Sequence, residues 1–215
     1  MKIVCVSDTH EQENNVIVPA GDVLIHSGDF TNNGRWFAFE KFLLWMEAQP
    51  HSAKILVAGN HDFMFQREGA RARQLVNSVA PSVTYLQDEE VTINGLKFYG
   101  SPWTPEFMKW AFMKERGLKM RAMWSLIPHD TQVLITHGPA HGTLDLTQDG
   151  THVGCEQLSK YLPIVRPLLH VFGHIHTGYG VHDTIFAEGP SLKSINAAAC
   201  DDNYAVVNPP IVVDA

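Results

Sequence analysis

Five short polar clusters contain the side chains of this 215-residue sequence that are best suited to chemistry. One cluster, Gly173-His174-Ile175-His176, places two imidazoles one residue apart directly after a short apolar run. The glycine before the pair and Gly178 after it let the backbone bend, so both rings could reach one pocket. A His-x-His pair is a weak signal by itself, but four other clusters also follow apolar runs: Asp8-Thr9-His10, Gly28-Asp29, Gly59-Asn60-His61-Asp62 and Thr136-His137-Gly138.

The potential ligand atoms in these clusters are oxygens and nitrogens, with no thiolate among them. They belong to Asp8, His10, Asp29, Asn60, His137, His174 and His176. This mix suits first-row divalent ions such as Mn²⁺, Fe²⁺ or Zn²⁺ better than a structural cysteine–zinc site. The set is larger than a single tetrahedral ion needs and suits two ions that share a carboxylate. The sequence therefore predicts two bound divalent metal ions. Among Mn²⁺, Fe²⁺ and Zn²⁺, we favour Mn²⁺.

Each cluster lies where an apolar run ends, and those runs are typical of buried strands. Lys2 to Val6 is β-branched and apolar, and Val23 to His26 and Ile55 to Ala58 have the same character. Further runs lie at residues 132–136 and 169–172. In open α/β sheets, ligand sites form outside the carboxyl ends of the strands. We therefore expect these loops to meet along one sheet edge, with His26, inside its strand, as a hydrogen-bonded core residue.

Helical periodicity appears in three places. Apolar residues recur at helical spacing from Arg35 to Gln49, and Pro50 stops the pattern. The segment Gln66–Val79 predicts a second, amphipathic helix, and Glu106–Trp124 a third that is interrupted near Gly117. Strands and helices thus alternate along the first part of the chain, which predicts the α/β class.

The second half of the sequence adds antiparallel strands. Asn94-Gly95 lies between two strand-like runs and has the signature of a two-residue hairpin. A long loop over residues 138–153 is of the kind that often covers a site. A short helix over Cys155–Leu162 ends at Pro163, and three β segments then finish the chain, at Tyr179–Phe186, Ser194–Ala198 and Tyr204–Val213. No repeat or linker divides the sequence, so we predict one domain over residues 1–215.

The overall composition limits the partners and the compartment. Hydrophobic residues make up 45% of the chain, which is enough for a sizeable core. A net charge of -7 and a pI near 5.9 give no electrostatic footprint for duplex nucleic acid or an anionic membrane. Three widely spaced cysteines argue against a disulfide framework, and no leader or membrane-spanning run precedes the first strand. We therefore expect a cytoplasmic protein.

In their order along the chain, the five clusters resemble the metal-binding motifs of the calcineurin-like metallophosphoesterase superfamily. More narrowly, the sequence resembles the metallophosphoesterase domain-containing branch, whose members are similar to cyclic-nucleotide phosphodiesterases. That narrower match is carried by residues 23–31, 99–103, 134–139, 173–180 and 208–212. The resemblance extends from about Ile3 to Asp214. It implies a four-layer α/β/β/α sandwich of two mixed β-sheets flanked by helices.

The resemblance also implies a role for each polar residue. The first metal would be held by Asp8, His10 and His176, the second by Asn60, His137 and His174, with Asp29 bridging the two. His61 would stand beside the ions as general acid, and Asp62 would orient its ring. The substrate would contact Asn60, His61 and Trp103, although for Trp103 packing is at least an equal alternative to stacking on a base or shielding the pocket.

The implied chemistry is hydrolysis of phosphoesters. Two divalent ions about 3.5–4 Å apart repel one another, and a bridging carboxylate offsets part of that repulsion. A water between them is acidified toward a pKa of about 7, and the bridging hydroxide attacks phosphorus in line. An alkoxide leaving group then needs a proton, for which a nearby histidine is a natural donor.

The favoured function is therefore a phosphodiesterase acting on small phosphoesters such as (cyclic) nucleotides. The alternative is a nucleotide-binding sensor or scaffold of low turnover that keeps the metal site. A protein phosphatase ranks last, because the short loops leave no obvious groove for a protein substrate. The sequence leaves open monoester or diester preference, the identity of the metals and whether the chain is a monomer or a dimer.

Overall fold

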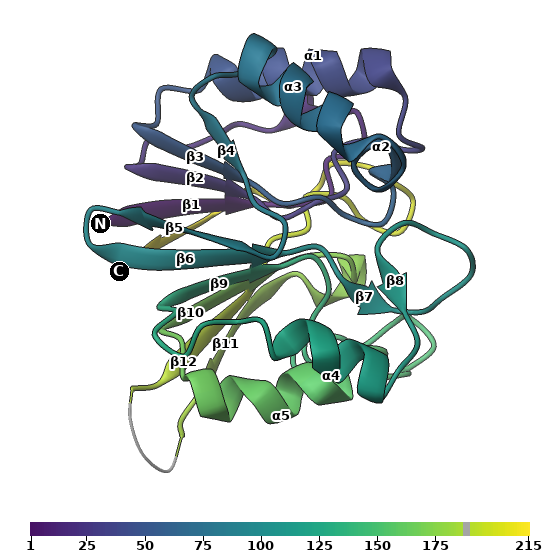
Figure 1. Cartoon of the computed structure of the whole chain (residues 1–215), viewed down its shortest axis with the longest axis vertical. Coiled ribbons are helices and arrows are strands. Elements are labelled where there is room, and N and C mark those ends of the chain that lie inside the picture. Colours follow the sequence, from purple (N-terminus) through teal and green to yellow (C-terminus); the bar gives the residue numbers. More distant parts are fainter. Residues whose placement is uncertain (187–189) are drawn as a thin grey trace.

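Two β-sheets lie face to face at the centre of the computed structural model, which describes residues 1–186 and 190–215 (Figure 1). The first sheet contains β1 (Lys2–Val6), β2 (Val23–His26), β3 (Ala53–Leu56), β4 (Val83–Tyr85) and β13 (Ile211–Asp214). Its strand order is β13-β1-β2-β3-β4. Strands β1 to β4 are parallel, whereas β13 pairs with β1 in the antiparallel direction.

The second sheet is also mixed. It contains β5 (Glu89–Ile93), β6 (Leu96–Ser101), β9 (Val133–Thr136), β10 (Leu169–Phe172), β11 (Gly180–Thr184) and β12 (Leu192–Asn196). Its order is β11-β12-β10-β9-β6-β5, with antiparallel pairs at the two ends and parallel pairs between them. The predicted hairpin is β5–β6, and positive φ at both Asn94 and Gly95 fits its two-residue turn.

Helices cover the outer faces of both sheets. They are α1 (Trp36–Glu47), α2 (Phe63–Arg67), α3 (Gly69–Val79), α4 (Leu118–Trp124) and α5 (Glu156–Val165), with short 3₁₀ turns η1 (Glu13–Asn15) and η2 (His176–Gly178). Figure 1 shows α1 and α3 against the first sheet and α4 and α5 against the second. The arrangement confirms the four-layer α/β/β/α sandwich expected from the sequence.

The core is layered in the same way because side chains alternate along each strand. In β1, Ile3 and Cys5 point into the apolar layer between the two sheets. Val4 and Val6 point the other way, into the layer beneath α1 and α3. Both faces of such a strand are buried, which is why the strand sequences read as continuous apolar runs.

The helix predicted over Glu106–Trp124 is wrong over most of its length. Among these residues only α4 is helical, and the segment before it folds back between the short strands β7 (Thr104–Pro105) and β8 (Met113–Lys114). Met108 and Phe112 have positive φ, which an α-helix does not allow. Contacts with distant residues decide this conformation, since the Ala111 N–H donates to the Asn60 carbonyl at 3.0 Å.

Three smaller boundaries also differ from the sequence prediction. The helix expected over Gln66–Val79 is divided at Glu68 into α2 and α3. Helix α5 continues through Pro163 for two more residues, because a proline in the last turn removes little helical hydrogen bonding. The last β segment is confined to β13, since Pro209 and Pro210 have no N–H to donate to a ladder.

Candidate metal centre

The loops that follow β1, β2, β3, β9 and β10 meet at one end of the two sheets. Hydrogen bonds join them directly: the Asp8 N–H donates to the Gly28 carbonyl at 2.9 Å, and the Gly173 N–H donates to the His137 carbonyl at 2.9 Å. The His61 N–H donates to the Asp29 carboxylate at 2.7 Å. The polar clusters of the sequence are therefore held together by bonds between loops, as strand-end placement predicts.

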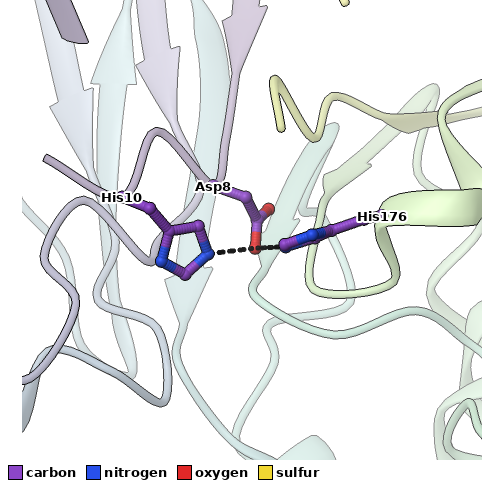
Figure 2. A group of neighbouring side chains, drawn as sticks. All are labelled: Asp8, His10 and His176. Carbon is purple, nitrogen blue, oxygen red and sulfur yellow. Dashed lines mark ion pairs between the residues drawn. The ribbon is translucent and has the colours of Figure 1, made fainter. Parts of the chain in front are cut away.

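Asp8, His10 and His176 form the first group of potential ligands (Figure 2). Asp8 Oδ1 lies 4.0 Å from His10 Nε2 and 3.5 Å from His176 Nε2. The other ring nitrogen of His176 donates to the Asp201 carbonyl at 2.8 Å, which leaves the Nε2 lone pair directed toward Asp8. The other oxygen of Asp8 accepts the His174 N–H at 2.9 Å, so this carboxylate also ties two clusters together.

Asp29, His137 and His174 form the second group, with Asn60 beside them. His137 Nε2 lies 3.3 Å from Asp29 Oδ2 and 2.9 Å from Asn60 Oδ1. His137 Nδ1 donates to the Ser27 carbonyl at 2.9 Å, so that Nε2 carries the lone pair. The rings of His137 and His174 are 4.9 Å apart between centroids.

Each group has the properties of a metal-binding site. Its ligand atoms lie within 4.8 Å of one another, and nitrogen or oxygen ligands bound at about 2.1 Å to one ion are about 3 to 3.5 Å apart. Asp8 Oδ1 and both ring nitrogens of His10 are buried and have no hydrogen-bond partner among the described residues. Buried polar atoms are normally satisfied, so these atoms fit cation ligands. The backbone acceptors behind His137 and His176 are the supports that metal-bound histidines usually have.

The backbone around the two groups is strained. Asp8, His10, Asp29 and His174 all have positive φ, between 45° and 68°. Non-glycine residues rarely adopt this conformation, and it concentrates at functional sites where surrounding structure enforces it. Tight packing adds to that constraint at Gly173, because a Cβ atom there would overlap the side chains of Asp8 and Ser7.

Electrostatic interactions within each group keep the carboxylates ionised. Burial opposes ionisation of Asp8 and Asp29, but the ion pairs that Asp8 forms with His176 and Asp29 forms with His137 hold the pKa of both carboxyl groups well below the usual range. Burial also opposes a charge on those two histidines, yet the adjacent carboxylates raise the pKa of each to about 9. A cation that binds here would therefore compete with protons for the same lone pairs.

His61 lies beside both groups and is supported by a residue that the sequence analysis did not identify. Its Nε2 is 3.9 Å from Asp29 Oδ2, and its Nδ1 donates to the Asn32 carbonyl at 2.6 Å. The expectation that Asp62 orients this ring is wrong. The Asp62 carboxylate instead accepts N–H groups of Gly59, Asp29 and Thr31 at 2.8 to 3.0 Å. It therefore ties together the loops after β2 and β3.

The structure also corrects the expectation for Trp103. Its indole N–H donates to Asp88 at 2.8 Å, and its ring packs 5.5 Å from that of Phe112, beneath the Lys114 ammonium. The packing alternative therefore holds, and Trp103 does not line the cavity at the metal centre.

Aromatic residues other than Trp103 line the cavity beside the ligand groups. A cavity of about 240 Å³ is lined by residues of both ligand groups, by His61 and by three aromatic side chains, Phe107, Trp110 and Tyr204. The ring centroid of Trp110 lies 3.7 Å from that of His61, and the ring centroid of Tyr204 lies 4.6 Å from that of His10. All three are in irregular segments after residue 105. Phe107 and Trp110 were not identified from sequence because a helix was predicted over residues 106–124.

Comparison with known proteins agrees with this geometry. Residues 1–178 match the model of the calcineurin-like phosphoesterases. The chain belongs to the calcineurin-like phosphoesterase family. It is 42% identical over 234 residues to metallophosphoesterase domain-containing protein 1 of Homo sapiens, covering 99% of this chain and 70% of that protein. It is 41% identical over 222 residues to UPF0046 protein K07C11.7 of Caenorhabditis elegans, with 99% and 74% covered.

A solved structure supports the same fold for this calcineurin-like phosphoesterase. The protein TT1561 of Thermus thermophilus superimposes with a TM-score of 0.63 at 13% identity, covering 90% of this chain and 88% of that one. At this identity the likeness concerns the fold alone. Among the helices of the described residues, none has the length and apolar character needed to cross a membrane.

Proposed function

We propose that this calcineurin-like phosphoesterase is a phosphodiesterase that binds two divalent metal ions and hydrolyses small phosphoesters such as nucleotides or cyclic nucleotides. One observation carries the proposal: two separate groups of buried and partly buried potential ligands and a supported histidine, His61, border the same cavity. Binding alone needs no proton donor beside the ligands, whereas cleavage of an ester whose leaving group is an alkoxide does.

The residues present fit a dinuclear centre. Asp8, His10 and His176 would hold one ion, Asn60, His137 and His174 the other, and Asp29 would lie between the two. The oxygen and nitrogen donors suit Mn²⁺, Fe²⁺ or Zn²⁺, and we favour manganese. When bound, the ions would supply an acidified water as nucleophile and neutralise negative charge on the phosphoryl oxygens.

The protein side chains would position the substrate and move a proton. His61 donates through Nδ1 to the Asn32 carbonyl, so its Nε2 faces the cavity and can transfer a proton to the departing oxygen. Asn60, beside the second ligand group, would help to hold a phosphoryl oxygen or the ion next to it. Asp62 would act through the backbone that it binds, as a positioning residue.

Charge in the cavity favours a diester over a monoester. Among the described residues that line it, there is no lysine or arginine. A monoester is largely a dianion near neutral pH and a diester is a monoanion, so a monoester would place an additional negative charge near Asp29 and Asp202 that only the bound metal ions, and no lysine or arginine of the cavity, would offset.

Hydrolysis of bis-p-nitrophenyl phosphate with added Mn²⁺ tests the proposal. We expect turnover by the wild-type protein, abolished by a chelator, and a loss of at least about a hundredfold for Asp29→Ala, because even outer-shell partners of a bound metal contribute about 10- to 100-fold. His129→Ala, at an exposed position, is the matched control. Equally slow hydrolysis by wild type and Asp29→Ala would exclude the enzyme.

A nucleotide-binding sensor of low turnover is the alternative, and the aromatic side chains Trp110 and Tyr204 in the cavity favour it as well, because either can stack on a base. Tight nucleotide binding without turnover in the same assay would support it. We further infer a cytoplasmic location, which the three unpaired cysteines support.

A further inference from the structure

A second and larger cavity opens directly beside the candidate metal centre. Its volume is about 680 Å³, and it shares Phe107, His174 and Asp202 with the cavity that contains the two ligand groups. Because His174 lines both, a molecule whose phosphate lies at the ligand groups can extend into the second cavity. The proposed reaction at phosphorus does not use this space.

The wall of the second cavity comes from several segments that are far apart in sequence. Pro105 is the last residue of β7 and Phe107 follows that strand, whereas Val153 comes from the long loop over residues 138–155. This loop is held in shape by Asp145, a fully buried carboxylate that accepts the N–H groups of Gly142 and Gly154 at 3.0 and 2.9 Å and pairs with His152 at 2.6 Å. The cavity is therefore formed in advance, as ligand cavities usually are.

The charges in this wall are mostly negative. Glu106, Asp149 and Asp202 contribute carboxylates. Arg116 is the one cation among the described lining residues, and it is already engaged: it donates to the carbonyl of Val153 at 2.7 Å and to the Glu156 carboxylate at 2.8 Å. The cavity thus combines apolar surface with more carboxylates than cationic side chains.

We propose that the second cavity receives the ester group that remains attached to phosphorus beyond the scissile bond, and that it selects substrates in which this group is bulky and carries no negative charge. The inference rests on the proposed phosphoesterase function and specifies its substrate class. A volume of about 680 Å³ lies within the range of about 300–1,000 Å³ typical of ligand cavities. Exposed phenyl surface on Phe107 offers contact to an apolar or aromatic group, whereas a polyphosphate or carboxylate there would meet like charge.

Three diesters with the same leaving group test this selection. They are p-nitrophenyl methyl phosphate, p-nitrophenyl phenyl phosphate and p-nitrophenyl 4-carboxyphenyl phosphate, assayed by release of nitrophenolate. We expect kcat/KM for the phenyl ester to exceed that for the methyl ester by about tenfold or more, since a buried aromatic ring contributes about 1.5–3 kcal/mol. The carboxyphenyl ester should be several-fold slower than the phenyl ester at low salt, and added salt should reduce that difference.

Substitutions in the wall of the second cavity test whether the ester preference arises there. Phe107→Ala should reduce the preference for phenyl over methyl, whereas Phe37→Ala, which removes a phenyl ring that is 80% exposed on α1, should not. Glu106→Gln should raise the relative rate for the carboxyphenyl ester, whereas Glu40→Gln, at an exposed position on α1, should leave it unchanged.

The outcomes separate this inference from the proposed function. Equal kcat/KM values for the methyl and phenyl esters, or a preference that Phe107→Ala leaves intact, would overturn the assignment while the phosphoesterase stands. If no ester is hydrolysed, the proposed function fails, and dissociation constants for the same three compounds, measured by calorimetry with Mn²⁺ present, decide whether the cavity selects them in the stated order.

Discussion

At the scale of single residues, the structure separates two neighbours that the sequence joins. His61 faces the cavity and is held by the Asn32 carbonyl, whereas the Asp62 carboxylate is directed into the loops behind it. Adjacent positions in a chain point in different directions when the backbone turns, so adjacency in sequence does not establish contact between side chains. Substitution of His61 should therefore reduce catalytic activity, whereas substitution of Asp62 should reduce the stability of the protein.

His61→Ala should affect hydrolysis according to the leaving group. A nucleoside 2′,3′-cyclic phosphate expels an alkoxide that needs a proton, so we expect kcat/KM to fall by about 10²–10⁴-fold. p-Nitrophenolate is a stable anion, so hydrolysis of its ester should fall much less. Both rates and the metal content, measured by elemental analysis, form the test. An equal loss on the two substrates, or loss of metal, would contradict the assignment of His61 as a proton donor.

Asp62→Asn should destabilise the protein. The carboxylate accepts N–H groups with both oxygens, and an asparagine of the same shape would direct its own NH₂ at one pair of those donors. Because the site is fully buried, we expect a loss of at least about 2 kcal/mol in the free energy of unfolding, measured with urea. Asp183→Asn, at an exposed ion pair on β11, is the control and should change stability by less than about 1 kcal/mol.

At the scale of elements, the strand ends with their polar clusters could be predicted from sequence because the signal is local. A short apolar run followed by a polar turn is visible within a few residues, as at Val6-Ser7-Asp8. The segment from Glu106 to Gly117 could not be predicted in this way. Its apolar residues match helical spacing, but a hydrogen bond to Asn60, far earlier in the chain, decides its path. Trp110 reaches His61 only because of that path.

The junction between β10 and η2 gives a prediction at this scale. Gly173→Ala would place a methyl group against the side chains of Asp8 and Ser7, so the loop that carries His174 and His176 must move. We expect a loss of about 1–3 kcal/mol in stability, as for other overpacked sites, together with metal content well below that of the wild type. Gly69→Ala, where an added Cβ meets no neighbour, is the matched control. Unchanged metal content in Gly173→Ala would show that the junction does not position the ligands.

At the scale of the whole molecule, the alternation of strands and helices predicts the α/β class, and the resemblance to the metallophosphoesterases implies the layer order that the structure has. The polar clusters that meet at this sheet edge could also be identified from sequence, since five motifs in fixed order carry far more information than any one residue. The shape of the space around the ligands was not predictable, because the sequence pattern indicates a helix at Phe107 and Trp110 and a strand at Tyr204, whereas all three residues lie in irregular segments. Substrate selection therefore depends on the irregular segments around the ligands, whose conformation is the hardest to predict from sequence.

The buried core also makes stability depend on pH, and His170 provides the test. This residue of β10 is fully buried, and burial lowers the pKa of its ring to about 3, whereas in the unfolded chain the value is about 6.5. Below pH 6.5 the unfolded chain binds a proton that the folded protein does not, so stability is complete above that pH and falls as the pH decreases toward 3. Between pH 7 and pH 5 this one group should cost roughly 2 kcal/mol in the free energy of unfolding.

His170→Asn should remove that part of the pH dependence, measured by urea unfolding with a chelator present throughout, and His129→Asn, at an exposed position, should not. If wild type and His170→Asn lose the same free energy over this interval, the histidine is already protonated in the fold, and the hydrogen bond of 2.8 Å between its Nε2 and Thr136 Oγ1 must then be one that the imidazolium donates.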